Sequence, residues 1–220
     1  MRPLLLLAIS TLPLLHLTGQ ELVDQGGALP AVEPDRSATK PGMFWGTVIK
    51  REQFRPLTGE QRWGLYWRQT YWTPGVYFRA AGIAGLDQNK NIPAEWGQGF
   101  GAYMKRVGNE FGRAAIQDSL EAAGAAALKQ DVRYVKCQCK GVFKRAGYAI
   151  GANFVTLNKH GRWEPAYARL GAAVGAQYIG NAWMPAGYRN WNTSLRDGGL
   201  QFAFGGAFNL IREFVPMKKR

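Results

Sequence analysis

The stretch from residue 93 to residue 131 constrains the fold more than any other part of this 220-residue chain. We predict that it forms one long helix, because its small residues recur at steps of three, four and seven, which return to one helical face. Each interior glycine costs a helix about 1 kcal/mol, so several of them indicate a compensating close contact with another helix backbone. The face carries Gly97, Gly101, Gly108, Gly112, Ala115, Ser119, Ala122 and Ala126.

Capping residues and prolines predict the helices on either side of this stretch. Thr58 and Gln61 form a capping box, which opens a helix that reaches Trp72. Pro74 disfavours continuation of that helix and suits the first turn of the next, which ends near Leu86. Three later helices are expected over residues 142–157, over residues 165–183, and from a cap within 190–194 to about residue 215.

The chain is therefore predicted to be all-α, a bundle of about five or six Gly- and Ala-rich helices. Gly171 and Gly175 repeat the close-packing pattern in the helix over 165–183. The alternative is a small outer-membrane β-barrel with strands within 148–157, 166–179 and 201–208. Helices are favoured because glycine and alanine form strands poorly, and because the glycines recur at three and four rather than at two.

Composition divides the chain into four parts. Residues 1–19 resemble a cleaved signal peptide, with Arg2, an apolar run over 4–17 and a small residue, Gly19, for cleavage; a retained anchor is the alternative. Residues 20–56 are predicted to be a flexible leader, within which residues 44–54 suit a short strand or an extended arm. The helical domain is expected over 57–216, followed by a basic tail over 217–220.

The charge balance points to an anionic partner. The formal net charge is +13, and loss of residues 1–19 removes one arginine and no acid, which leaves +12. In an exported protein such a charge predicts contact with phospholipid head groups, lipopolysaccharide or acidic wall polymers rather than with nucleic acid. The alternative is a solvated positive surface that keeps a glycine-rich protein in solution.

Aromatic residues and arginine gather in the helix that the capping box opens. They suit a belt at a membrane interface, where rings lie at the depth of the head groups, or the aromatic core face of a soluble bundle. The candidate membrane- or ligand-contacting residues are Trp63, Tyr66, Trp67, Arg68, Tyr71 and Trp72.

Transmembrane helices are not favoured. The uncharged run over 170–188 has the length of a span, but it contains Gln177 and Asn181 and derives little hydrophobicity from Gly and Ala. The long central stretch carries charged residues that are each costly in lipid. They include Lys105, Arg106, Glu110, Arg113, Asp118 and Glu121. A compact bundle, or one lying partly in a membrane interface, is expected.

The sequence offers no catalytic or metal-binding constellation. Cys137 and Cys139 are the two cysteines and suit a local disulfide in an exported protein, or two incidental thiols. After loss of residues 1–19 the chain has a single histidine, His160, in a turn-like segment. We therefore expect no enzymatic activity, no cofactor and no metal.

Several motifs together resemble a group of exported, glycine-rich bacterial envelope proteins that has no assigned function. They are PAEWGQGFGAYMKRVG from residue 93, DVRY from residue 131, Tyr148-Ala with Val155-Thr156, and REFVP from residue 212. The resemblance covers about residues 57 to 216 and implies a bacterial envelope location without an assigned reaction. The Cys-Gln-Cys segment is not part of it.

We therefore expect a non-enzymatic protein of the bacterial envelope, exported to the periplasm or the outer membrane. It would associate with a membrane or an anionic envelope surface through its Trp/Tyr/Arg-rich and small-residue helices, and possible partners include further copies of itself. The alternative is a soluble periplasmic or secreted module that binds an anionic lipid or glycan.

Overall fold

Helices dominate the part of the chain that the structure describes. The structure is a computed structural model, and it describes residue 42 and residues 46–215. The predicted signal peptide, residues 20–41 of the predicted leader and the basic tail lie outside the described residues. Within them the six α-helices are α1 (Gly59–Trp67), α2 (Pro74–Asn89), α3 (Phe100–Ala127), α4 (Val142–Gly151), α5 (Tyr167–Gly180) and α6 (Trp191–Phe214). The predicted all-α class is confirmed.

Two small sheets and five short helical segments connect these helices. Strand β1 (Val48–Ile49) pairs in parallel with β2 (Tyr134–Val135), and β3 (Val155–Leu157) pairs antiparallel with β4 (Trp163–Pro165). Segment η3 (Arg68–Trp72) is a π-helix that continues α1. The remaining segments are the 3₁₀ turns η2 (Arg51–Gln53), η4 (Ala94–Trp96), η5 (Asn181–Trp183) and η6 (Ala186–Tyr188).

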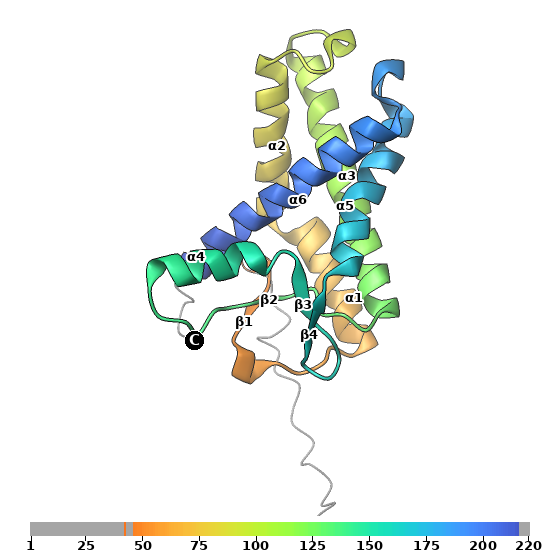
Figure 1. The fold of residues 1–220 in the computed structure, drawn as a ribbon. Helices are drawn as coiled ribbons and strands as arrows, with labels where there is room; N and C mark the ends of the chain where they lie inside the picture. The colour runs from red at the N-terminus through yellow and green to blue at the C-terminus, as the bar shows by residue number, and fades with distance from the viewer. Residues whose placement is uncertain (1–41, 43–45, 216–220) are drawn as a thin grey trace, which may run out of the picture. The chain divides into compact units, whose positions relative to one another are not determined.

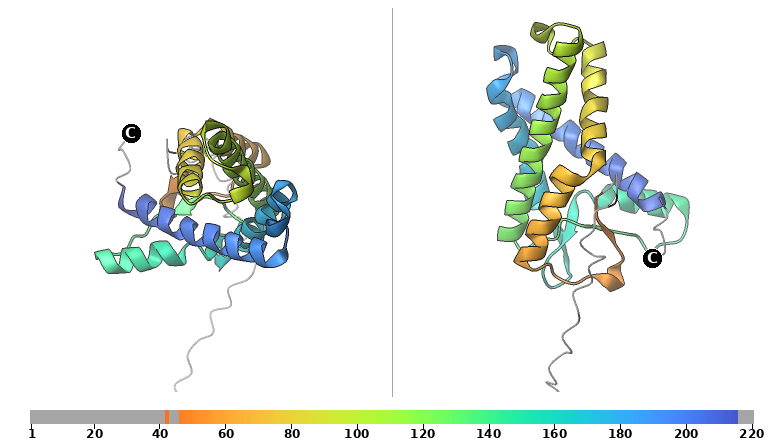
Figure 2. Two further views of the ribbon diagram at one scale, coloured as in Figure 1. Left: turned by 90° about the horizontal axis from the view of Figure 1, so that it is seen from above. Right: turned by 180° about the vertical axis from the view of Figure 1, so that it is seen from behind.

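Helices α2, α3 and α5 lie side by side, and α6 crosses them. Helix α3 packs against α2 on one side and against α5 on the other, and α2 and α3 run antiparallel (Figure 1). Helix α6 packs mainly on α5 and α4 (Figure 2).

Local sequence signals fix three helix starts as predicted. The Thr58 side chain accepts from the Gln61 backbone N–H, and the Gln61 side chain accepts from the Thr58 backbone N–H. Pro74 is the first residue of α2. The Asn190 side chain accepts from the backbone N–H of Thr193 at the start of α6.

The long central helix is shorter than predicted. Helix α3 begins at Phe100 rather than at residue 93, because Gly97 and Gly99 adopt φ angles of 70° and 96°, which are incompatible with a right-handed helix. The buried Arg106 side chain donates to the backbone oxygens of Ile92, Pro93 and Gly97 and so holds this turn against α3.

Other predicted boundaries shift where short strands form. The helix expected over 142–157 ends at Gly151, because residues 155–157 pair with residues 163–165 as β3 and β4. The helix expected over 165–183 runs from Tyr167 to Gly180. It begins later than predicted because residue 165 belongs to β4.

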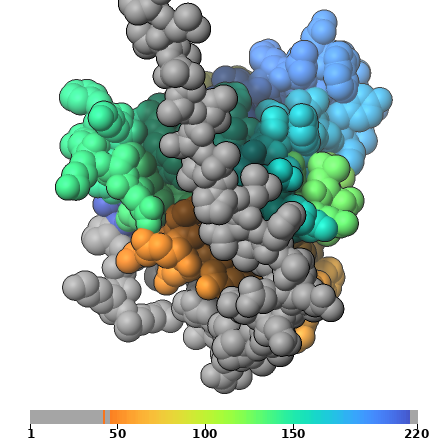
Figure 3. All heavy atoms as spheres, turned by 60° about the horizontal axis from the view of Figure 1, so that its bottom comes forward, coloured from red at the N-terminus to blue at the C-terminus, as the bar shows by residue number. Residues whose placement is uncertain are grey.

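The last part of the predicted leader belongs to the folded body. Ile49 of β1 is buried against Val135 and Leu157, and Phe54 packs on the same group. This agrees with the short strand that the sequence allowed over 44–54. Figure 3 shows the atoms of this segment (orange) at the surface beside those of the α4 region (green).

The glycine contacts predicted for α3 and α5 are mostly wrong. Added Cβ atoms at Gly97, Gly101, Gly108 and Gly171 would meet nothing within 4 Å. A Cβ atom added at Gly112 would lie 3.8 Å from the Trp183 ring. Of the predicted glycines only Gly175 is tightly packed, because a Cβ atom there would lie 3.2 Å from Leu120 Cδ1. The buried positions of α3 are Ala102, Arg106, Arg113, Ala114 and Ala125.

The physical reason is that a helical period identifies a face but not the neighbour that the face meets. Gly101 and Gly108 each lie one or two residues from a buried position, and one residue corresponds to about 100° around the helix. The close backbone contacts occur at glycines outside the predicted set. A Cβ atom added at Gly124 would lie 3.2 Å from Ala168 Cβ, and one added at Gly198 would lie 2.9 Å from Val174 Cα.

Candidate functional site

Exposed aromatic side chains follow α1 and η3. Trp63, Trp67 and Trp72 are 65%, 45% and 72% exposed. The Trp63 and Trp67 rings lie 6.1 Å apart, and the Trp67 and Tyr71 rings 4.6 Å apart. The tryptophans of this stretch therefore do not form a buried aromatic core.

The row of rings continues onto neighbouring helices. The Tyr71 ring contacts the Phe111 ring of α3, which stacks on Tyr77 of α2 at 5.2 Å. The Tyr66 hydroxyl lies 2.8 Å from the Ser119 hydroxyl and attaches α1 to α3. We call the whole set the aromatic surface: Trp63, Tyr66, Trp67, Tyr71, Trp72, Tyr77 and Phe111.

The structure places all six predicted contact residues on α1 and η3. Arg68 is exposed, as is Trp72 four residues later. The π-helix that carries them is a rare conformation, and such segments occur frequently at functional sites. The inner side of η3 is polar, because buried Thr70 donates to Asp118 Oδ2 at 3.1 Å.

A polar cavity lies behind η3, in the space between α6 and the α2–α3 pair. Its volume is about 130 Å³. Five charged side chains line it: Arg79 of α2, Asp118 and Glu121 of α3, Arg169 of α5 and Arg212 of α6. Amide side chains line much of the rest, namely Gln69, Gln117, Asn153, Gln201 and Asn209. Sequence reasoning missed this cavity, because its residues come from segments far apart in the chain.

Charges in the cavity wall are partly paired. Arg169 Nε lies 2.9 Å from Glu121 Oε1, and Arg212 Nη1 donates to Asn209 Oδ1 at 3.0 Å. Removal from bulk water raises the pKa of Asp118 to about 6, against the opposing effect of the Arg79 charge. The same desolvation lowers the pKa of Arg212 to about 10.

A second polar cluster joins α6 to the segment before α4. Glu213 is fully buried, and its Oε2 atom accepts from the Tyr134 hydroxyl and from the Cys137 backbone N–H, each at 3.0 Å. Arg145 of α4 donates to Glu213 Oε1 at 2.8 Å. Burial, followed by the Glu213 charge, raises the pKa of Tyr134.

This cluster brings together the sequence motifs that begin at residues 131 and 212, which the sequence alone did not connect. The predicted disulfide pair lies beside it: the structure joins Cys137 and Cys139, whose Cα atoms are 5.3 Å apart. Every polar group of Glu213 is engaged by the protein itself. The arrangement therefore stabilises the fold by joining α6 to α4 and to the segment before it.

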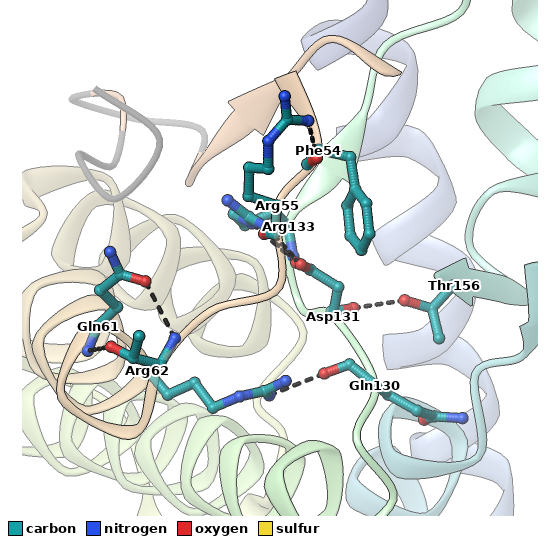
Figure 4. Close-up of polar contacts among 9 residues, drawn as sticks. Phe54, Arg55, Gln61, Arg62, Gln130, Asp131, Arg133 and Thr156 are labelled. Atoms are coloured by element: carbon teal, nitrogen blue, oxygen red, sulfur yellow. Dashed lines mark hydrogen bonds and ion pairs between the residues drawn. The ribbon is translucent and has the colours of Figure 1, made fainter. Parts of the chain in front are cut away.

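A third polar cluster fastens residues 54–62 to the chain around residue 131 (Figure 4). Arg133 Nη2 lies 2.6 Å from Asp131 Oδ2 and also donates to the backbone oxygen of Arg55. Arg62 Nη1 donates to the backbone oxygen of Gln130 at 2.8 Å, and the Thr156 hydroxyl donates to that of Asp131. Because the ion pair is buried and satisfied, this cluster also supports the fold.

Among the described residues, no three His, Cys, Asp or Glu side chains are grouped so that they could hold a metal ion. Within the same residues, no helix combines the length and the apolar character that crossing a bilayer requires. Two features therefore remain as candidates for function: the aromatic surface and the polar cavity.

In comparisons of the chain with protein-family models, curated proteins and solved structures, nothing matches. A function for the chain is therefore inferred from the geometry and chemistry of the aromatic surface and the polar cavity.

Proposed function

We propose that this chain is a non-enzymatic protein of a bacterial envelope that binds an anionic membrane surface through its aromatic surface. The observation that carries the proposal is the exposure of Trp63, Trp67 and Trp72 on one continuous helical segment. Tryptophan and tyrosine rings favour the interface between lipid and water, because their apolar faces and polar edges match the two sides.

Electrostatics support the same partner. The chain has a formal net charge of +13, and Arg68 is exposed within the ring-bearing segment. A basic side chain close to an anionic leaflet contributes about 1 kcal/mol to binding. The rings and the positive charge would therefore act together, and binding would weaken as salt increases.

The proposal is also supported by how the apolar side chains are distributed. Among the described residues, most buried apolar side chains are alanines, whereas many large ones are exposed. Large exposed apolar patches mark sites of interaction with proteins or membranes. Within the aromatic surface, the exposed rings of Trp63 and Trp67 contact each other, and the Trp67 ring also contacts Tyr71.

The test measures binding of the chain without residues 1–19, called the mature chain below, to two kinds of vesicle. One contains phosphatidylcholine alone, and the other contains phosphatidylcholine with 30% phosphatidylglycerol. We expect cosedimentation and a blue shift of tryptophan emission with the anionic vesicles. The triple variant Trp63→Ala/Trp67→Ala/Trp72→Ala should weaken binding by at least about tenfold, since three interfacial rings are lost.

A matched triple variant, Trp163→Ala/Trp183→Ala/Trp191→Ala, removes three exposed tryptophans that lie outside the aromatic surface. It should bind as the unmodified chain does. Equal binding by the first triple variant, or no binding of the unmodified chain to anionic vesicles, would overturn the proposal. Binding to a soluble anionic glycan without vesicle binding would favour the soluble-module alternative instead.

A further inference from the structure

The polar cavity has the lining of a binding site rather than of a packing gap. Empty cavities in proteins are apolar, whereas this one is bordered by five charged and several amide side chains. Its volume of about 130 Å³ far exceeds the space that one water molecule needs. It therefore has room for a small polar molecule.

The charge of the lining selects an anion. Three arginines face two carboxylates, and both carboxylates already have partners, since Glu121 pairs with Arg169 and Asp118 accepts from Thr70. Within the described residues, no hydrogen bond or ion pair involves the side chain of Arg79. The positive excess of the cavity is thus located at a guanidinium that is available to a ligand.

Arg79 and Asp118 both line the cavity, so the Arg79 charge acts within this space. Burial is the main influence on the pKa of Asp118, and Arg79 is the strongest influence in the opposite direction. The two groups therefore lie near each other without forming an ion pair, on helices α2 and α3 that border the cavity. An anion bound there would meet a fork-shaped donor that suits carboxylate and phosphate oxygens.

Gln117 favours a ligand that also carries a hydrogen-bond donor. It lines the cavity, and its side-chain oxygen Oε1 is buried without a hydrogen-bond partner in the described structure. A buried acceptor without a donor is costly, so a ligand that supplies a hydroxyl would remove that cost. The cavity therefore offers an anion-binding donor and an unsatisfied acceptor.

We propose that the polar cavity binds a small anion that carries one carboxylate or phosphate group and one hydroxyl donor. Arg79 binds the anionic oxygens, and Gln117 accepts from the hydroxyl. The size is about that of six non-hydrogen atoms, because an engineered cavity of about 150 Å³ holds benzene. Hydroxy acids and hydrogen phosphate have this chemistry.

The test uses glycolate and inorganic phosphate as probes, with acetate as an anion that lacks the hydroxyl. Titration calorimetry and thermal unfolding are measured on the mature chain at constant ionic strength. Glycolate and phosphate should bind and raise Tm, and acetate should bind more weakly. Arg79→Ala should weaken the binding of glycolate and phosphate by at least about tenfold. Gln117→Met should reduce glycolate affinity to that of acetate.

Arg196→Ala is the matched control, because Arg196 lies on the surface of α6 with its side chain 65% exposed and paired with Asp197. It should bind all three probes as the unmodified chain does. Arg79→Lys, which keeps the charge but not the fork, should give intermediate affinity. Circular dichroism establishes that each variant is folded. Failure of both glycolate and phosphate to bind, or equal binding by Arg79→Ala, would overturn the proposal.

A further arm distinguishes a free anion from a lipid head group. If the anionic group belongs to a lipid, Arg79→Ala should also weaken binding to phosphatidylglycerol vesicles. If it belongs to a free molecule, that variant should bind vesicles normally. The triple tryptophan variant should retain glycolate binding in either case, so this inference and the proposed membrane function succeed or fail separately.

Discussion

The two sides of α3 differ in how they meet their neighbours. Toward α5, Gly124 lies against Ala168, and buried Arg113 donates to the side-chain oxygens of Gln177 and Asn181. Toward α6, the side chains of residues 117, 118 and 121 border the polar cavity. The first side is filled and hydrogen-bonded, whereas the second leaves an open polar space.

The difference shows what small residues accomplish in this fold. A glycine or alanine at the contact lets α5 approach α3 closely, and a single long polar side chain then finds its partners within the contact. On the other side, longer polar side chains border the cavity instead. One side of the helix therefore specifies the fold, and the other leaves room for a ligand.

The largest expected effect tests this contrast with the same substitution on both sides. Arg113→Ala should lower the free energy of unfolding by about 3 kcal/mol or more, because it leaves two buried amide oxygens without donors. Arg79→Ala, in the cavity, should lower it by less than about 1 kcal/mol. Urea denaturation measures both. Similar losses for the two variants would show that the two sides do not differ.

The next effect depends on pH. Because the pKa of Asp118 is raised to about 6 in the folded chain, folding favours its protonated form. The stability that the protonated Asp118 carboxyl contributes to the fold is fully present below about pH 4 and is lost as pH rises to about 6. Asp118→Asn should therefore raise the free energy of unfolding at pH 7 by about 2–3 kcal/mol and change it little at pH 4.

Urea denaturation at the two pH values checks this prediction. Thr70, Arg79, Glu121 and Arg212 all influence Asp118 and stay in place in the variant. A loss of stability at pH 7 would mean that the ionised carboxylate supports the fold and that the cavity is not a destabilised polar space.

A smaller effect is expected at the contact between α5 and α6. Gly198→Ala should cost about 1–3 kcal/mol, because the new Cβ atom would lie 2.9 Å from Val174 Cα and 3.0 Å from the Ala173 oxygen, which are backbone atoms. Thermal unfolding measures the loss. An unchanged Tm would indicate that α6 can move away from α5 freely.

The smallest effect has the opposite sign. Gly171 is exposed in α5 and a Cβ atom there would meet nothing within 4 Å. Gly171→Ala should therefore stabilise the chain by about 0.5–1 kcal/mol through helix propensity alone. Destabilisation of the isolated chain would show that this glycine has a close neighbour after all.

Local signals in the sequence predicted local structure well. Thr58 with Gln61, Pro74 and Asn190 each act on backbone groups within a few residues, so their effect does not depend on the rest of the fold. The spacing of Trp63, Trp67 and Tyr71 predicts one helical stripe, and Trp67 contacts both of the other rings. Spacing alone did not determine whether those rings are buried or exposed, since that depends on which helices cover them.

Features that depend on distant segments were not predictable in this way. The stripe through Gly101 and Gly108 identified a face of α3, but α5 packs on a different one. The turn before α3 is held by Arg106, whose backbone acceptors lie nine or more residues earlier in the chain. The polar cavity has no signature at all, because four different helices supply its charged groups.

Helix α6 is held near both of its ends by side chains outside the cavity. Near its start, Asn181 Nδ2 donates to Ser194 Oγ at 2.8 Å, and near its end Glu213 binds Tyr134 and Arg145. Both ends of α6 are therefore fixed by residues that do not line the cavity. Substitutions in these two anchoring regions are expected to shift α6 and so alter the affinity of the polar cavity for its ligand, although none of these residues contacts that ligand.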